Sequence, residues 1–104
     1  MKYGLSDRVL EQILSVLRRY DKVEKAVIYG SRAKGNYRPG SDIDITLFGK
    51  GLTILDLHNL EIMLDELYLP YSFDLSIFEK LQNEDLIDHI NRVGKVIFDR
   101  EKRV

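Results

Sequence analysis

Two aspartates one residue apart, Asp42 and Asp44, accompany a strand-like segment at residues 43–48. Side chains alternate across a strand, so both carboxylates should point to one face while the apolar residues point to the other. A third aspartate, Asp74, stands in the middle of another strand-like segment at residues 72–77. Because aspartate is disfavoured in strands and adjacent like charges need a counter-ion, this pattern predicts a cation site.

The three aspartates suit a hard cation because carboxylate oxygens are the ligands preferred by Mg²⁺ and Mn²⁺. Two such ions about 4 Å apart would activate an attacking oxygen and stabilise a leaving one in phosphoryl-type transfer. The structural alternative is that Asp42 only begins a strand after a turn, while Asp44 and Asp74 face solvent on an open sheet. The alternating pair together with a third mid-strand aspartate favours the metal site.

A Gly-Ser turn, Gly30 and Ser31, directly follows a strand-like segment at residues 25–29. The next residues can form a helical turn, whose free N–H groups would bind a phosphate. Gly30 allows close approach of the backbone, the Ser31 hydroxyl can donate to a phosphate oxygen, and Arg32 or Lys34 can neutralise charge. A Gly-Ser turn alone is weak evidence, but next to the aspartates it predicts a nucleotide site with its metal.

Helices and strands are expected to alternate along the chain, which predicts an α+β (α/β-like) class with a small sheet backed by helices. Ser6 should cap a helix ending near Tyr20, Thr53 a helix closed off by Pro70, and Asn83 a helix ending before Gly94. The expected strands lie at residues 25–29, 43–48, 72–77 and 95–98.

Length and composition place further bounds on the chain. Its 104 residues, 44% hydrophobic and 32% charged, predict a single globular domain spanning 1–104, with a loosely held, flexible tail at 99–104. The net charge of -1 predicts no strong binding to nucleic acid, and the absence of cysteine excludes thiolate metal sites. There is neither a signal peptide nor an apolar run of membrane-spanning length, so a cytoplasmic protein without membrane contact is expected.

Residues 30–45, GSRAKGNYRPGSDIDI, resemble the signature of the DNA polymerase beta nucleotidyltransferase superfamily. That signature is Gly-Ser, roughly ten residues, and then Asp-hydrophobic-Asp-hydrophobic. The third family carboxylate, in a hydrophobic-Asp-hydrophobic context, matches Asp74 between Phe73 and Leu75. The fuller form resembles the minimal nucleotidyltransferases of prokaryotes, the MNT or MntA-type antitoxins.

The resemblance implies the nucleotidyltransferase fold, with a mixed sheet, and two Mg²⁺ ions, with Mn²⁺ as the other candidate metal. It implies transfer of a nucleoside monophosphate, AMP from ATP or the equivalent from another NTP, to an acceptor hydroxyl. Gly30 and Ser31 would hold the triphosphate, Asp42 and Asp44 would ligate both metals, and Asp74 would complete the catalytic metal. The implied acceptor is a tyrosine of a HEPN toxin partner, for which the protein would serve as antitoxin.

Two other functions remain open from the sequence. One is a non-catalytic antitoxin that neutralises its partner by binding, and the other is a nucleotidyltransferase for a small molecule such as an aminoglycoside, or for an RNA end. Larger nucleotidyltransferases carry a second, acceptor-binding domain, so a core this short is expected to borrow its acceptor site from another protein.

Four further residues have a structural and a functional interpretation. His58 and His89, on predicted helices, are expected to be surface or structurally satisfied residues rather than ligands. Tyr37 and Arg38, in the loop within the motif, either stack on a base and contact phosphate or belong to a solvated loop.

Overall fold

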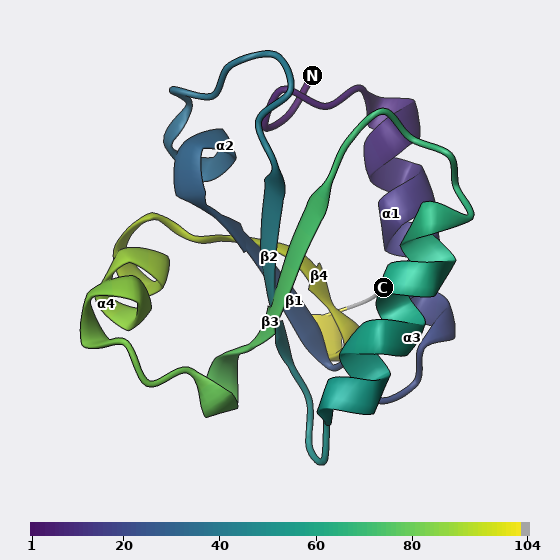
Figure 1. The fold of residues 1–104 in the computed structure, drawn as a ribbon, viewed down its shortest axis with the longest axis vertical. Helices are drawn as coiled ribbons and strands as arrows, with labels where there is room; N and C mark the ends of the chain where they lie inside the picture. Colours follow the sequence, from purple (N-terminus) through teal and green to yellow (C-terminus); the bar gives the residue numbers. More distant parts are fainter. Residues whose placement is uncertain (103–104) are drawn as a thin grey trace.

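The computed structural model describes residues 1–102, in which helices and strands alternate as predicted. The helical elements are α1 (Asp7–Arg19), α2 (Gly30–Lys34), α3 (Ile54–Asp65), η1 (Phe78–Lys80), α4 (Glu84–Val93) and η2 (Arg100–Lys102). The strands are β1 (Lys25–Tyr29), β2 (Ile43–Phe48), β3 (Phe73–Ile77) and β4 (Lys95–Asp99), in the sheet order β3-β2-β1-β4 (Figure 1). β2 and β3 run parallel, whereas β1 runs antiparallel to both β2 and β4. This mixed sheet confirms the predicted fold class.

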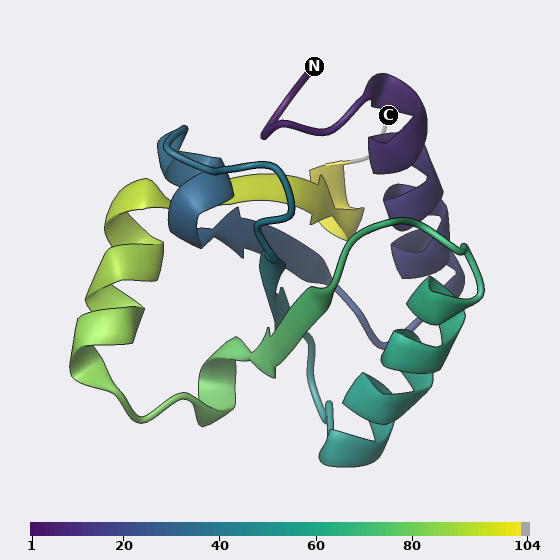
Figure 2. The ribbon, with the colours of Figure 1, turned by 45° about the horizontal axis from the view of Figure 1, so that its top comes forward.

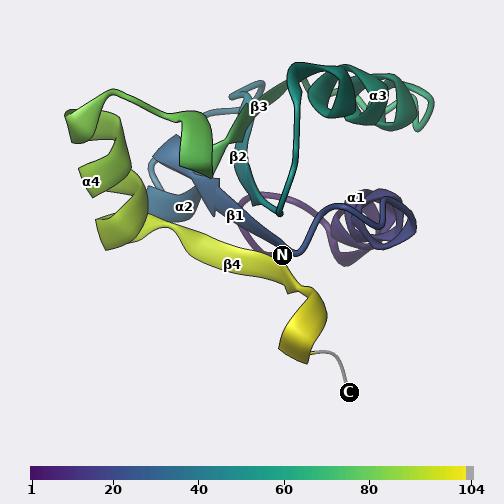
Figure 3. The ribbon, with the colours of Figure 1, turned by 90° about the horizontal axis from the view of Figure 1, so that it is seen from below.

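The two faces of the sheet are covered by different helices (Figure 3). α1 and α3 lie on one face, where the fully buried Ile43, Ile45 and Leu47 of β2 enter the larger core. α4 lies on the other face, where Ile90 packs with Val27 and Tyr29 of β1 in a smaller cluster. The alternation of β2 therefore directs its apolar residues to the larger core and leaves its other face for polar side chains.

The predicted helix starts are confirmed by their caps. The Ser6 side chain accepts from the Val9 N–H, and the Asn83 side chain accepts from the Leu86 N–H. Thr53 forms a capping box with Asp56, in which each side chain accepts from the other residue's backbone N–H. The three long helices thus begin where short polar side chains satisfy their free N–H groups.

The end of α3 differs from the prediction. The helix ends at Asp65 rather than continuing to Pro70: the Leu67 and Tyr68 N–H groups donate to carbonyls only three residues back, and Tyr68 then turns the chain away with a left-handed φ of 54°. Ile54, Leu55 and Ile62 of this helix are exposed, so its apolar residues are not confined to the core-facing stripe.

The predicted loose tail is wrong for residues 99–102, while residues 103–104 lie outside the described residues. Asp99 closes β4, and Arg100 reaches back across the chain to the end of α1. Its Nε donates to the Val23 carbonyl at 2.9 Å, and its Nη2 donates to the Leu17 and Tyr20 carbonyls at 3.2 Å each. The tail prediction failed because the mixed charges of this segment gave no sign of a cap for a distant helix.

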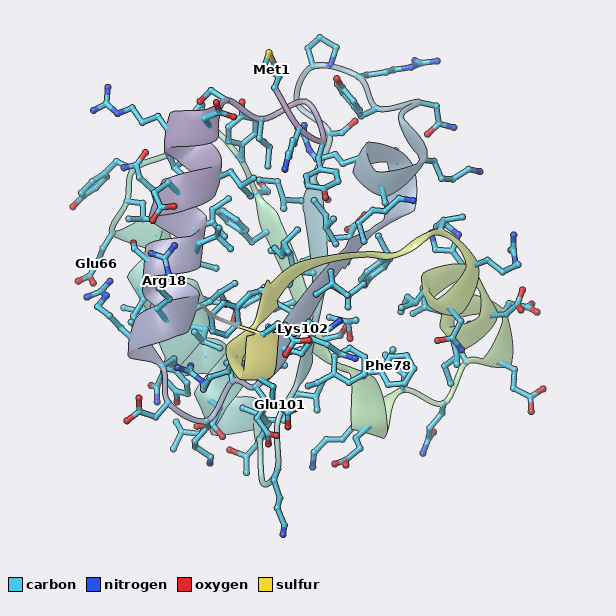
Figure 4. All side chains as sticks on the ribbon, turned by 180° about the vertical axis from the view of Figure 1, so that it is seen from behind. Met1, Arg18, Glu66, Phe78, Glu101 and Lys102 are labelled. Atoms are coloured by element: carbon cyan, nitrogen blue, oxygen red, sulfur yellow. The ribbon has the colours of Figure 1, made fainter. Side chains whose placement is uncertain are left out.

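Replacing Arg100 by alanine should lower the free energy of unfolding by about 2–3 kcal/mol, because charge-assisted bonds to several carbonyls are lost together. Urea unfolding at neutral pH measures the change. The control is Lys102→Ala, at an exposed position on η2 (Figure 4), which should alter stability by less than about 0.5 kcal/mol. Equal stability of the two variants would show that the Arg100 contacts contribute nothing.

Candidate active site

A phenol and two carboxylates form a row across three strands on the face opposite the larger core. In the strand register Tyr29 faces Asp44, and Asp44 faces Asp74. Facing residues of neighbouring strands project to the same side of a sheet, so these side chains lie next to one another. Asp42 directly precedes β2, two residues before Asp44, and is near enough for its negative charge to raise the pKa of Asp44. The structure therefore brings the three predicted aspartates to one place on the sheet.

The charge of this cluster is not neutralised. Partial burial raises the pKa of Asp44, and the negative charges of Asp74 and Asp42 raise it further, while Arg32 opposes them. Burial likewise raises the pKa of Tyr29, opposed by a hydrogen bond with Ser76, and the charges of Asp74 and Asp44 add to the rise. The phenol therefore stays protonated beside carboxylates that repel each other.

Asp56 shows what a compensated aspartate looks like in the same molecule. Its buried carboxylate accepts from the Lys22 ammonium at 2.8 Å, from the Tyr20 hydroxyl and from the Thr53 N–H. These bonds, the one from Lys22 foremost, hold the pKa of Asp56 far below its ordinary value. Asp44 has no such set of donors among residues 1–102, which is the condition of a carboxylate that needs a cation.

The carboxylates fit a hard divalent cation by their chemistry, since they offer oxygen ligands alone. Within residues 1–102, no three Asp, Glu or His side chains are drawn together tightly enough to hold a metal ion as they stand. Repulsion between the carboxylates favours such a spread arrangement.

Gly30 connects the Gly-Ser turn to the carboxylates. It has φ of +73°, and a Cβ built on it would collide with Oδ2 of Asp44. The Asp44 carboxylate thus lies against the Cα of Gly30, in space that any other residue would fill. Residues 30–34 form the predicted helical turn, α2, and Ser31 in its first turn is partly exposed.

Arg32 takes a different role from the predicted phosphate contact. The residue is 3% exposed, and its guanidinium donates to the Ser41 carbonyl at 2.7 and 3.2 Å and to the Tyr3 carbonyl at 3.0 Å. Its charge also lies over the ring of Tyr71 at 5.0 Å. Arg32 therefore anchors the loop that leads into Asp42, and only its long-range charge reaches Asp44.

The other predicted cations and the aromatic residue lie in or beside the same loop. Lys34 on α2 and Arg38 in the loop are exposed. Tyr37 lies with its ring over the Arg32 guanidinium, 5.4 Å from its centre, and against Gly4. Lys34 is thus the predicted phosphate-neutralising residue whose side chain remains accessible beside the turn.

His89, expected to be a surface or structurally satisfied residue, contacts the Gly-Ser turn, a contact that the sequence interpretation missed. The Gly30 N–H donates to its Nε2 at 3.0 Å, and its ring meets Tyr29 edge-on, with centroids 6.1 Å apart and planes at 76°. The signal available in the sequence was its spacing, because His89 falls three residues after Leu86 and next to Ile90, on the inward side of the predicted helix. Figure 2 shows α4 beside α2, the arrangement that makes this contact.

A family model described as Polymerase beta, Nucleotidyltransferase matches residues 11–103. The chain belongs to this family. The superfamily resemblance of residues 30–45 is thereby confirmed, and the match extends over both strands that carry the aspartates. Among curated proteins none matches the sequence.

Solved structures share the nucleotidyltransferase fold of this chain. A chain of a toxin–antitoxin crystal structure with AMP-PNP superposes with a TM-score of 0.72 and 22% identity, over 86% of this chain and 73% of that one. A chain of the complex of tri-AMPylated Shewanella oneidensis HEPN toxin with MNT antitoxin gives 0.69 and 18%, over 94% and 76%. A protein assigned as a minimal nucleotidyltransferase gives 0.65 and 26%, over 91% and 95%. The neighbours thus include minimal nucleotidyltransferases and toxin–antitoxin complexes.

None of the helices in residues 1–102 combines the length and the apolar character needed to cross a bilayer.

Proposed function

We propose that this nucleotidyltransferase transfers AMP from ATP to a tyrosine hydroxyl of a HEPN toxin and so acts as its antitoxin, with Mg²⁺ as cofactor. The observation that carries the proposal is the row formed by Asp44 and Asp74, with Asp42 beside it, directly against the Gly30-Ser31 turn. A family membership that covers both parts of this constellation supports it.

Asp42, Asp44 and Asp74 would hold the metal, in agreement with their oxygen donors and the unneutralised charge at Asp44. Bound there, Mg²⁺ or Mn²⁺ would supply charge neutralisation and Lewis acidity for transfer between phosphate and hydroxyl. The Ser31 N–H and hydroxyl would bind the phosphates, and Lys34 would neutralise part of their charge.

The transfer itself is an exchange of one phosphorus–oxygen bond for another. The acceptor oxygen forms a bond to the α-phosphorus of ATP, the bond to the β-phosphate oxygen breaks, and pyrophosphate leaves. Asp74 is exposed and would accept the proton of the attacking hydroxyl. The Tyr29 phenol, buried and protonated, would remain an uncharged neighbour of Asp44 and take no part in the proton transfer.

The position of Asp74 supports an acceptor on another protein. It lies on β3, an edge strand of the sheet, so a tyrosine side chain can approach from the open side. The structures similar in fold include a HEPN toxin described as tri-AMPylated in complex with an MNT antitoxin. The partner and the modified residue come to this chain by analogy with that complex.

The test is incubation of the purified protein with α-labelled ATP, Mg²⁺ and the protein encoded by the neighbouring gene, which the proposal expects to be a HEPN toxin. Label should appear on a tyrosine of the partner, and removing Mg²⁺ with EDTA should abolish it. Parallel reactions with CTP, GTP and UTP define the base preference, and an aminoglycoside panel tests the small-molecule alternative. Failure to label the partner while MgATP binding is intact would refute the proposed acceptor.

The second candidate, neutralisation by binding alone, is favoured by one observation. Among residues 1–102, Asp42, Asp44 and Asp74 are not close enough together to coordinate one metal ion as they stand. This function predicts that a D42N/D44N double variant still protects cells from the toxin. Loss of protection with preserved complex formation would decide for catalysis.

A further inference from the structure

The Gly30 N–H is already occupied in the folded protein. It donates to Nε2 of His89 at 3.0 Å, and His89, a residue of α4, is half-buried against Tyr29 at the end of β1. A backbone N–H can only donate, so Nε2 must be the unprotonated ring nitrogen, with the proton on Nδ1 of a neutral imidazole. His89 therefore contributes an acceptor here, and no positive charge for a phosphate.

The same glycine sets the place of a proposed metal ligand. Oδ2 of Asp44 lies where a Cβ of Gly30 would be. A shift of Gly30 would therefore change the packing of this carboxylate. The Tyr29 ring, which precedes Gly30 and faces Asp44 in the register, is held edge-on by His89. One imidazole thus fixes both residues at the point where β1 turns into α2.

We propose that His89 is a positioning residue, which holds the Gly30-Ser31 turn in the conformation that binds the triphosphate. This inference rests on the proposed function for its effect on nucleotide. It assigns the phosphate-binding donors of the turn to the Ser31 N–H and hydroxyl, because the Gly30 N–H stays with His89 when the nucleotide binds. It adds a positioning role to the expectation that His89 is a surface or structurally satisfied residue.

Three substitutions test the acceptor without removing the whole side chain. His89→Phe keeps a ring but has no acceptor, His89→Leu is a second variant without one, and His89→Gln offers an amide oxygen that can accept. His58→Phe, at an exposed position on α3, is the matched control. Each variant is first compared with the wild type by thermal unfolding.

Hydrogen exchange of single amides, followed by NMR without nucleotide, reports on the contact itself. In His89→Phe and His89→Leu the Gly30 amide should exchange about tenfold faster, while the Ile90 amide in α4 is unchanged. His89→Gln should restore most of the protection. Faster exchange of both amides would indicate general destabilisation and would overturn the positioning role, as would unchanged exchange at Gly30.

Nucleotide binding reports on the consequence. Calorimetry should show MgATP binding about fivefold to tenfold weaker in His89→Phe than in the wild type, with His89→Gln close to the wild type. In transfer assays the KM for ATP should rise by more than kcat falls, because Ser31 binds the triphosphate before the chemical step. The Gly30 amide of the wild type should remain protected when MgATP is bound.

The outcomes separate this inference from the proposed function. If His89→Phe binds MgATP as tightly as the wild type does, the role of His89 is overturned and the proposed function stays intact. A wild type that binds no MgATP overturns the proposed function, and with it the assignment of phosphate donors to Ser31. If MgATP binding makes the Gly30 amide of the wild type exchange faster, phosphate has displaced His89 from it. That result also overturns the inference.

Discussion

Asp44→Asn is expected to lower the rate of the proposed AMP transfer by at least about 10³-fold, about 4 kcal/mol of transition-state stabilisation. The change keeps the shape of the side chain but removes the charge that faces Asp74 across the parallel strands. Steady-state transfer to the proposed HEPN partner measures it, with Asp85→Asn, at an exposed position in the first turn of α4, as a control for loss of one surface charge.

Asp44→Asn should be less active but more stable than the wild type in the absence of metal. Because the pKa of Asp44 is raised in the folded protein, the folded state binds this proton more tightly than the unfolded chain does. The resulting stability is present below the ordinary carboxyl pKa of about 4 and is lost as the pH rises through the folded value. Without metal, Asp44→Asn should therefore unfold at a higher temperature than the wild type at pH 7, and the difference should shrink on acidification.

Added Mg²⁺ should reverse that order, because it stabilises the wild-type carboxylates and has little to bind in the variant. Thermal unfolding with and without Mg²⁺, at pH 7 and near pH 4, covers all four conditions. A wild type that is more stable than Asp44→Asn in EDTA at pH 7 would contradict the unneutralised charge at the site.

Gly30→Ala is expected to lower the rate of the proposed AMP transfer by about 10²-fold, because the new Cβ would displace the Asp44 carboxylate on which it impinges. The positive φ adds about 1 kcal/mol of backbone strain. Transfer rates and urea unfolding separate the two effects.

The chain offers a matched control in Gly51→Ala. Gly51 has φ of +78°, close to that of Gly30, but a Cβ built there has no neighbour within 4 Å. It should show the same loss of stability from the backbone and full transfer activity. Equal activity of the two variants would mean that the closeness of Gly30 and Asp44 has no part in the reaction.

Much of the fold could be predicted because its signals are local. The helix starts at Ser6, Thr53 and Asn83 are capping patterns of adjacent residues, and the alternation of β2 shows which of its residues face the core. The family signature similarly lies within one continuous stretch of the chain, residues 30–45.

What the sequence missed depends on contacts between distant residues. Arg100 caps α1 from more than 75 positions away, and His89 meets Gly30 across 59 positions. Arg32 was misassigned because a cation beside a Gly-Ser turn suggests a phosphate, whereas its actual acceptors are the Tyr3 and Ser41 carbonyls, brought to it by folding. No local pattern distinguishes an arginine that binds a ligand from one that joins two loops.

The three aspartates lie on parts of the sheet that differ in local stability. Asp44 belongs to β2, which is hydrogen-bonded on both sides, and Asp42 directly precedes that strand, whereas Asp74 belongs to β3, which has a neighbour on one side only. Strands at a sheet margin open more readily than those inside it. Mild denaturant or heat should therefore unfold β3 locally and displace Asp74 while the rest of the fold persists. Activity would then be lost before the protein unfolds globally.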